Sequence, residues 1–582
     1  MTGSFLLPVS RASAMPLRKV VLIFVVAALV ASGCGGKKAG EADKVVDDSA
    51  PEAVESGLDD AGEPVRGGSI AYGLEAETTG GFCLSDAQLA ISGIMVARSI
   101  YDTLTVPNDE GGYVPWLAES VEHNAAYDEW TVKLRDGVTF HDGTDLDAQV
   151  VKNNLDAVRG LNPKRPSPLG SATFHNIASV EVADDLTLRI TTHVPWVAFP
   201  AYLYSSGRYA IMAQSQLDDP ENCNKDLVGT GPFKFEEWKQ NEFLRVSRNE
   251  NYWREAPDGK PYPYLDSVEF RPISEGEQRV NALESGEIQA LHTSSSRQTV
   301  RLRGLREDGE VNLTESTRLA EVGYAMFNAS KPPFDDIRMR QAMQMGFDRE
   351  GLTQELGQGL PVLADGPFAD GVLGHLDDTG YPEYDPEKAK DLIEEYRVDK
   401  GLDKVKVTLS STSDPEVQDI AVAVQADAKD LGLDMEINVV EQSKLINDAI
   451  GGSYEATLFR NHAGGDPDTQ FVWWKSKIRG VDGQMVDNFV NFGRIKDPEI
   501  DRLLDEGRSE IDPAKRQEIY EDLNRQFAKQ GWNAWLAFTR WAVATVPSVH
   551  GVYGPELPDG SKPSTGLATG HTLMGMWTTE TG

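Results

Sequence analysis

The amino-acid sequence predicts an α/β protein whose folded body divides into two or three lobes. Between about Gly67 and Gly582, segments with the alternating apolar pattern of strands take turns with segments whose apolar residues recur at helical spacing. This body is too long to fold around one hydrophobic core. The order of its elements therefore indicates several mixed lobes.

The chain begins with the pattern of an exported protein. Arg18 and Lys19 precede the apolar run 20–30, which is short for a membrane span, and small residues then lead to Cys34. This arrangement resembles a bacterial lipobox. It predicts a signal peptide over 1–33 and lipidation of Cys34; the alternative is an ordinary cleaved signal followed by an incidental cysteine.

The segment after Cys34 has the composition of a disordered tether. Residues 35–66 contain no aromatic residue, few branched apolar residues and many acids. Such a composition buries too little apolar surface to offset the entropy of the chain. No later stretch reaches the roughly 18 apolar residues of a membrane span. The sequence thus predicts a body that does not cross the membrane and is held near it by a lipid.

The charge of the chain excludes one class of partner. With 92 acidic and 56 basic residues, the formal net charge is −36. Nucleic-acid binding relies on clustered Lys and Arg, so we expect no nucleic-acid partner. The acidity is typical of a soluble exposed protein and does not predict the charge of a ligand.

Two cysteines remain in the body after the anchor. Cys83 and Cys223 form an even pair in an exported chain, which favours a disulfide; two unpaired buried thiols are the alternative. If they pair, the region after the first strand lies beside the region before Gly229. A chain that leaves a lobe and later returns to it would bring them together.

Strand and helix signals alternate through the body. The predicted strands cover residues 68–74, 130–134, 186–192, 405–410 and 435–440. The predicted helices cover residues 86–104, 145–158, 416–431, 498–508 and 513–529. We expect Thr144 to cap the helix at 145–158, and Asp-Pro pairs to open the last two helices.

A series of motifs resembles the extracellular solute-binding proteins of family 5, the binding components of ATP-binding-cassette importers for oligopeptides, dipeptides and nickel. The matching segments, in order, are 100–105 (IYDTLT), 116–120 (WLAES), 130–144 (WTVKLRDGVTFHDGT), 229–233 (GTGPF), 248–253 (RNENYW), 282–288 (ALESGEI) and 332–342 (PPFDDIRMRQA). The resemblance extends over about 67–553, which is nearly the whole body.

The resemblance implies a bilobal periplasmic-binding-protein-like fold with an additional smaller domain, which closes by a hinge. The implied divisions are a signal peptide (1–33), the lipidated cysteine and tether (34–66), a first segment of domain I (67–104), domain II (105–216), a second segment of domain I (217–325), domain III (326–535), and a return to domain I with a C-terminal tail (536–582). It also implies a monomer that catalyses no reaction and holds no cofactor.

Several motifs have a structural explanation that competes with a chemical one. His141 and Asp142 could suggest an acid-base pair, but no Ser or Cys nucleophile motif accompanies them. Asp142-Gly143 suits a tight turn instead. The segment 229–232 has no Lys-Ser/Thr at phosphate-loop spacing, so a packed bend is expected. Histidine spacing predicts no zinc site, and the acids at 466 and 468 favour a turn over a calcium loop.

The loop after residue 458 is the segment most expected to touch a solute. In peptide-binding members of the family, the position that Ala463 occupies holds an Asp that pairs with the α-amino group of a peptide. A methyl group cannot balance a buried ammonium, so that route is in doubt here. Arg460, Asn461 and His462 offer donors for a carboxylate, phosphate or sugar oxygen. The alternative makes Arg460 a salt bridge between lobes and His462 a solvated loop residue.

Other predicted ligand-binding residues come from further places in the chain. Glu75, Glu77 and Thr78 follow the first strand, and Asn328 lies where domain III begins. Trp473 could stack on a ligand. Packing in the core is the competing explanation for both Trp473 and Trp474.

The leading function is a lipid-anchored receptor on the extracytoplasmic face of a bacterial membrane, which captures a small solute and delivers it to an importer's permease and ATPases. The solute is expected to be peptide-like, with an oligosaccharide or a metal chelate as alternatives. A surface sensor or adhesin with the same fold is a second class of function. A secreted hydrolase is a third, although the sequence shows no nucleophile or carboxylate pair for it.

Overall fold

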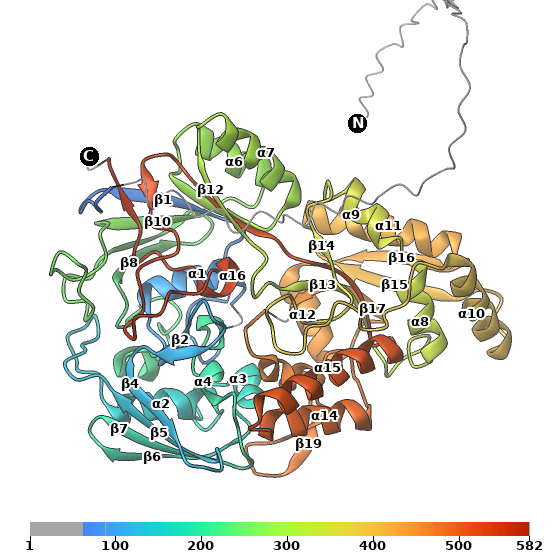
Figure 1. The fold of residues 1–582 in the computed structure, drawn as a ribbon, viewed down its shortest axis with the longest axis horizontal. Helices are drawn as coiled ribbons and strands as arrows, with labels where there is room; N and C mark the ends of the chain where they lie inside the picture. Colours follow the sequence, from blue (N-terminus) through green and yellow to red (C-terminus); the bar gives the residue numbers. More distant parts are fainter. Residues whose placement is uncertain (1–61, 79, 88, 462, 581–582) are drawn as a thin grey trace, which may run out of the picture. The chain divides into compact units, whose positions relative to one another are not determined.

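The computed structural model describes residues 62–78, 80–87, 89–461 and 463–580. The predicted signal peptide, Cys34 and nearly all of the predicted tether lie outside these residues, and so does His462. The described chain forms mixed sheets with flanking helices (Figure 1), so the predicted α/β class is confirmed.

The first large sheet collects strands from three separate stretches of the chain. Its order is β12 (Asn312–Ser316), β21 (Trp541–Thr545), β11 (Ala290–Thr293), β1 (Ser69–Leu74), β10 (Ser267–Pro272), β9 (Phe243–Arg248) and β8 (Phe233–Lys239). β1 runs parallel to both β10 and β11. Five of its six residues are buried, as expected for a parallel strand covered on both faces. The strand predicted at 68–74 is confirmed.

The second large sheet has six strands. Its order is β14 (Val362–Leu363), β20 (Asn533–Phe538), β13 (Val322–Phe327), β17 (Ala456–Asn461), β15 (Lys406–Ser411) and β16 (Asp434–Val439). β15 is parallel to β16 and β17, and the helices α11 (Pro415–Asp430) and α12 (Gln442–Gly451) connect them. The predicted strands at 405–410 and 435–440 and the helix at 416–431 are correct to within one residue at each end.

A smaller sheet of four strands stands apart in sequence from both. Its order is β4 (Ala118–His123), β5 (Glu129–Leu134), β7 (Thr187–Thr192) and β6 (Ile177–Asp184), all antiparallel. The other described strands form two-stranded ribbons: β2 (Thr105–Pro107) with β3 (Tyr113–Pro115), β18 (Lys477–Arg479) with β19 (Met485–Asp487), and β22 (Val549–His550) with β23 (Trp577–Thr578).

Helices connect and cover these sheets (Figure 1). In addition to α11 and α12, they are α1 (Ile91–Ile100), α2 (Ala148–Val158), α3 (Pro168–Thr173), α4 (Phe199–Tyr202), η1 (Ser205–Gly207), α5 (Gln214–Asp218), α6 (Gly276–Glu284), α7 (Ser296–Glu307), α8 (Ile337–Gly346), α9 (Arg349–Glu355), α10 (Pro386–Asp399), η2 (Pro467–Gln470), α13 (Phe471–Trp474), α14 (Pro498–Ser509), α15 (Pro513–Gln530) and α16 (Leu567–Gly570). The helix predicted over 86–104 is thus shorter than expected and covers only the ten residues of α1.

Aspartates cap several of these helices. Asp497 and Asp512 accept backbone N–H groups at the starts of α14 and α15, each with proline at the first helical position, as predicted. The prediction that Thr144 caps α2 is wrong. Asp147 is the cap and accepts the N–H of Val150 at 2.8 Å, because the chain stays extended until that residue.

The chain crosses twice between the two large sheets. One crossing, residues 317–321, joins β12 to β13, and the other, residues 539–540, joins β20 to β21. The crossings are linked by a hydrogen bond from the N–H of Thr539 to the carbonyl oxygen of Glu321 (2.8 Å). The predicted boundaries after 325 and 535 fall inside β13 and β20, so both strands belong wholly to the six-stranded sheet.

One buried carboxylate joins several of the motifs found in the sequence. Asp102 accepts hydrogen bonds from Trp116 Nε1 (2.8 Å), Thr230 Oγ1 (2.9 Å), the Tyr252 hydroxyl (3.1 Å) and Trp253 Nε1 (3.2 Å). Burial raises the pKa of Asp102 above its ordinary value, and the four donors oppose that effect. These motif residues therefore share one structural task, the satisfaction of a buried acid.

The Gly-Thr-Gly-Pro segment is a packed bend, as predicted. A Cβ atom at Gly229 or Gly231 would overlap the carbonyl group of Ile100 at the end of α1. Both positions require glycine because of this close approach and not because of a phosphate ligand. His141 supports the same bend: its Nε2 lies 3.0 Å from the Gly231 carbonyl oxygen, and burial lowers its pKa to about 4.

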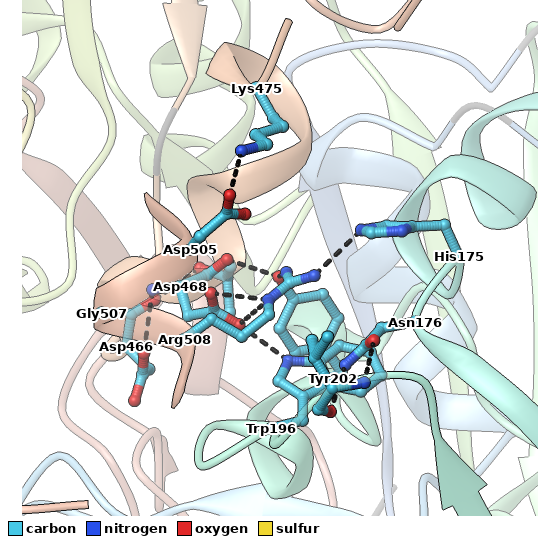
Figure 2. A network of polar contacts seen from close by, with 12 residues as sticks. His175, Asn176, Trp196, Tyr202, Asp466, Asp468, Lys475, Asp505, Gly507 and Arg508 are labelled. Atoms are coloured by element: carbon cyan, nitrogen blue, oxygen red, sulfur yellow. Dashed lines mark hydrogen bonds and ion pairs between the residues drawn. The ribbon is translucent and has the colours of Figure 1, made fainter. Parts of the chain in front are cut away.

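A buried ion pair ties the four-stranded region to the six-stranded lobe (Figure 2). Asp468 and Arg508 are both almost fully buried, with 3.0 Å between Arg508 Nε and Asp468 Oδ1. Trp196 Nε1 donates to Asp468 Oδ2 at 2.7 Å, and the Tyr202 hydroxyl donates to the Asp468 carbonyl oxygen. Burial acts to lower the pKa of Arg508, but Asp468 outweighs it and raises that pKa.

His175 completes this network as an acceptor. Its Nε2 lies 2.9 Å from Arg508 Nη1, and a guanidinium can only donate. Burial, reinforced by the charge of Arg508, holds the pKa of His175 well below its ordinary value. The neutral imidazole therefore packs against the cation without repulsion.

Cys83 and Cys223 form the expected disulfide, with a Cα–Cα distance of 5.1 Å. Both cysteines are buried in the hydrophobic core beside β1. The bridge joins the loop after β1 to the segment before Gly229, two stretches separated by 140 residues. Within the described part of the chain, no helix has the length and apolar character needed to cross a membrane.

Removal of the disulfide should destabilise the body without changing its fold. The paired change Cys83→Ala and Cys223→Ala releases a long loop in the unfolded chain, which should cost about 2–5 kcal/mol of unfolding free energy. Urea denaturation of the variant and of the reduced wild type measures this. Equal denaturation midpoints for the variant and the oxidised wild type would contradict the role of the bridge.

Asp468→Asn should destabilise the protein far more than a matched change at its periphery. It leaves the buried Arg508 without its counter-ion, at an expected cost of about 3–5 kcal/mol. The control is Asp505→Asn, since Asp505 pairs with Lys475 at 2.6 Å but is 62 % exposed. An exposed pair contributes about 0–1 kcal/mol. Chemical denaturation should separate the two variants; similar losses in both would refute the assignment.

Candidate ligand-binding site

A cavity of about 610 Å³ is lined by residues of both large sheets. Its volume is within the range of small-molecule sites. Segments that follow β1, β10 and β11 contribute to its wall from the seven-stranded lobe, and segments that follow β15 and β17 contribute from the six-stranded lobe. These are parallel strands in both sheets, and ligands of α/β proteins bind beyond the carboxyl ends of such strands.

The six-stranded lobe forms a crevice at this edge. β15 and β17 are parallel neighbours, and the chain leaves β15 through α11 and leaves β17 through the loop to η2 and α13. α11 packs in the hydrophobic cluster on one face of the sheet, and α13 packs in the cluster on the other. The two connections diverge to opposite faces, which opens space between them.

Arg460, near the end of β17, contacts the opposite lobe and the residues at both crossings. Its Nη1 donates to Ser294 Oγ of the opposite lobe at 2.8 Å, and its Nε lies 3.2 Å from Glu321 in the crossing segment. Its guanidinium also lies over the Trp541 ring, 5.3 Å from the ring centre. Burial lowers its pKa, but Glu321 and Glu75 outweigh burial and raise it. The side chain remains 42 % exposed, so it faces the cavity as well.

Glu75 follows β1 and is held within its own lobe. Its Oε1 accepts the N–H of Ser294 at 2.6 Å, and Arg279 Nη2 lies 3.6 Å away. Burial acts to raise the pKa of Glu75, but Arg279 and the neighbouring His292 outweigh it and lower that pKa. The carboxylate is therefore ionised and already engaged by protein donors.

Two further contacts cross between the lobes at the starts of α7 and α11. The N–H of Ser296 donates to Glu416 Oε1 at 3.3 Å, and Arg297 Nη2 donates to Asp419 Oδ2 at 3.0 Å. Burial raises the pKa of Glu416 above its ordinary value. The carboxylate of one lobe thus lies at the N-terminus of a helix in the other, where it is favoured by the unpaired N–H groups.

Another part of the cavity wall is aromatic. Tyr324 on β13 pairs with Phe459 on β17, and their rings lie 6.2 Å apart. Phe492 lies 5.9 Å from Phe459 and 5.3 Å from Trp473, in edge-to-face orientation. All four residues line the cavity.

The structure brings only some of the predicted ligand-binding residues together. Glu75, Arg460, Asn461 and Trp473 line the cavity, and Ala463 lies beside them. Trp473 belongs to the short helix α13 and not to an extended segment, and its neighbour Trp474 is buried in the core. His462 lies outside the described residues.

Glu77, Thr78 and Asn328 are placed away from the cavity. Glu77 accepts the N–H groups of Thr78 (2.7 Å) and Asn241 (2.6 Å), and it turns toward that loop. Thr78 packs against Gly93 in α1. Asn328 is fully buried and donates to the carbonyl oxygens of Gly452 (3.1 Å) and Tyr454 (2.9 Å). Each of these side chains has a local structural partner.

Sequence reasoning missed Glu321, Glu416, Phe492 and Trp541, which all line the cavity. Glu416 could have been found, because it begins the predicted helix that follows the strand predicted at 405–410. Ligands of α/β proteins bind beyond the carboxyl ends of such strands. Glu321 and Trp541 lie on or beside the two crossings, whose adjacency only the folded chain reveals. Among the described residues, no group of three or more His, Cys, Asp or Glu is arranged to hold a metal ion.

Known proteins share this architecture. The glutathione-binding protein GsiB of Pectobacterium atrosepticum is 26 % identical over 466 residues, which is 80 % of this chain and 87 % of that protein. The structure of AgaA from A. tumefacien R10, bound to agropinic acid, superposes with a TM-score of 0.75 at 24 % identity. It covers 88 % of this chain and 99 % of AgaA.

The oligopeptide-binding protein AppA of Bacillus subtilis, bound to a nonapeptide, gives a TM-score of 0.74 at 22 % identity, with 89 % of this chain and all of AppA covered. These structural likenesses confirm the predicted periplasmic-binding-protein-like fold. The sequence profile of the bacterial extracellular solute-binding proteins, family 5 (middle region), matches residues 112–480. That match covers more than half of the chain, which therefore belongs to the bacterial extracellular solute-binding proteins of family 5.

Proposed function

We propose that this chain is the solute receptor of an ATP-binding-cassette importer and that it encloses a peptide-like solute between its two lobes. The observation that carries the proposal is the cavity, whose wall is drawn from both large sheets. A solute in that position contacts both lobes at once. It can therefore stabilise a closed form relative to an open one.

Similar proteins support a peptide-like solute. GsiB is named for glutathione, a tripeptide, and AppA was solved with a nonapeptide. Agropinic acid in AgaA shows that the fold also accepts other small polar molecules. A peptide is the solute class common to two of these three proteins, and we adopt it for this chain.

The charged end of the cavity suggests how a peptide is held. Arg460 has donor capacity beyond Ser294 and Glu321 and is partly open to the cavity, so it can meet a peptide carbonyl or carboxylate. Ala463 provides no carboxylate at its position in the loop, and the carboxylate of Glu75 is already engaged by Ser294 and Arg279. We therefore expect acceptor groups of the solute to contribute more to binding than its free amino group.

Delivery requires the receptor to stay near its permease. Lipidation of Cys34 and a tether over 34–66 would hold the body at the extracytoplasmic face of the membrane, as the lipobox-like sequence indicates. The body itself makes and breaks no covalent bond in this proposal. The permease and its ATPases, which are separate proteins, supply the transport step.

Glutathione and short peptides should raise the melting temperature of the purified body. Binding to the native state alone adds about 2.7 kcal/mol of stability when the ligand is at 100 times its Kd. A thermal-shift screen with glutathione, di- to pentapeptides, oligosaccharides and nickel–histidine chelates ranks the classes. Stabilisation by an oligosaccharide or chelate, with none from any peptide, would replace the proposed solute.

Arg460→Ala should weaken binding of the best peptide by about 1.5–3 kcal/mol, the value of a hydrogen bond to a charged group. Arg297→Ala is the matched control, since Arg297 also lines the cavity and its guanidinium is paired with Asp419. Calorimetry on both variants measures the difference. If Arg460→Ala leaves the affinity unchanged and the affinity depends on the free amino group of the peptide, the acidic residues of the cavity recognise the peptide instead.

Cys34→Ser should release the protein from the membrane fraction into the medium or periplasm, because the thiol is the proposed lipid attachment point. The body should keep its melting temperature. Fractionation followed by immunoblotting checks this, with Cys83→Ser and Cys223→Ser as the control that removes thiols without touching the anchor. Unchanged membrane attachment of Cys34→Ser would refute the lipid anchor.

A further inference from the structure

The aromatic residues that line the cavity indicate which kind of solute group can bind beside them. Here we call the residues Leu169, Tyr209, Phe459, Trp473 and Phe492 the aromatic chamber; all five line the cavity. Leu169 and Tyr209 come from the region of α3 and α4, and the other three come from the six-stranded lobe.

Leu169 and the three residues of the six-stranded lobe belong to one hydrophobic assembly, while Tyr209 packs against the neighbouring one. Leu169, Phe459 and Trp473 are partly buried and pack against the same core cluster, which contains Phe492 and Ala172 of α3. Each of these three side chains is only partly buried, and each also borders the cavity. Apolar surface is thus left uncovered inside the cavity, where an apolar group would gain by displacing water.

No formal charge belongs to the aromatic chamber. Burial raises the pKa of Tyr209 above its ordinary value, so its phenol is neutral, and its hydroxyl lies 3.5 Å from Thr173 Oγ1. Arg460 follows Phe459 directly in β17, and successive strand residues point to opposite faces of a sheet. The charges around Arg460 are therefore on the other side of the sheet edge. Arg208, beside Tyr209, also lines the cavity and acts on the Tyr209 hydroxyl. A positively charged solute group in the aromatic chamber would therefore lose hydration and be repelled by this guanidinium, without gaining a partner.

We infer that the solute carries an uncharged apolar group, an aromatic ring or a branched aliphatic chain, and that this group occupies the aromatic chamber. The inference rests on the proposed function, because it assigns one part of the solute in that same cavity. It makes Trp473 and Leu169 specificity-determining residues. The solute lies with its polar groups near Arg460 and its apolar group between α3 and α13.

Small probes test this without knowledge of the natural solute. The protein is labelled with 5-fluorotryptophan, and the resonance of Trp473, one of 11 tryptophans, is assigned with Trp473→Phe. Benzyl alcohol and benzylammonium are titrated while that resonance is followed by fluorine NMR. Benzyl alcohol should shift the resonance with an affinity at least about tenfold above that of benzylammonium, because burial of an unpaired positive charge is costly.

A matched pair of substitutions locates the binding. Leu169→Phe adds volume in the aromatic chamber and should lower the affinity for benzyl alcohol at least threefold. Leu356→Phe makes the same change where the cavity is lined from the end of α9 and should leave that affinity unchanged. An unshifted Trp473 resonance, equal affinity for benzylammonium, or equal effects of the two substitutions would each overturn the inference.

A final arm separates this inference from the proposed function. Gly-Phe-Gly and Gly-Leu-Gly should displace benzyl alcohol from the wild type, and Gly-Gly-Gly should not do so at the same concentration. If no peptide displaces the probe but the neutral probe still binds selectively, the peptide function falls and the aromatic chamber stands. If Gly-Gly-Gly competes as well as the others, the assignment of the apolar group falls and the peptide function stands.

Discussion

The buried carboxylate of Asp468 is the constraint on which the shape of the binding cavity depends. It is fully buried, so it must be neutralised by Arg508 and receive the indole N–H of Trp196. Trp196 comes from the region of the four-stranded sheet, whereas Asp468 and Arg508 belong to the six-stranded lobe. The same requirement holds the region of α3 and α4 against the segment of η2 and α13, beside the aromatic chamber. A buried acid is thus satisfied only when the two regions are in contact.

Much of the fold could be predicted because local patterns and the motifs agreed. The βαβ unit from β15 to β16 was predicted to within one residue, since its strands are rich in apolar residues and its helix has a strong cap at Asp414. The motifs could be recognised but their physical role could not, because Asp102 collects its four donors from segments up to 151 residues apart. The domain boundaries expected after 325 and 535 fall within β13 and β20, because no break in composition marks where these strands begin or end.

The candidate site was predictable only where strand ends could be located. Glu75 directly follows a predicted strand, and Arg460 was expected in the loop after residue 458; the structure places Arg460 within β17, and both residues line the cavity. Glu77, two residues further on, turns to the backbone of Asn241 instead, because a loop has no fixed alternation of side-chain direction. Asn328 follows β13, which ends on the side of its sheet away from the cavity. Its side-chain amide therefore donates to the backbone carbonyl oxygens of residues 452 and 454. Whether a residue at a strand end reaches the cavity depends on the direction of that strand within its sheet. A local sequence pattern does not predict this direction.

The two crossings between the large sheets have a mechanical consequence. A rotation of one lobe about residues 317–321 and 539–540 moves atoms in proportion to their distance from that axis. The contacts of Arg460 with Glu321 and Trp541 lie beside the axis, so their lengths change little during the rotation. The contacts of Glu416 with Ser296, of Trp196 with Asp468 and of Arg460 with Ser294 involve no residue of the crossings. Only interactions that differ between two conformations can shift their populations. Under such a rotation these contacts would set the balance between conformations, while those of Arg460 with Glu321 and Trp541 would persist.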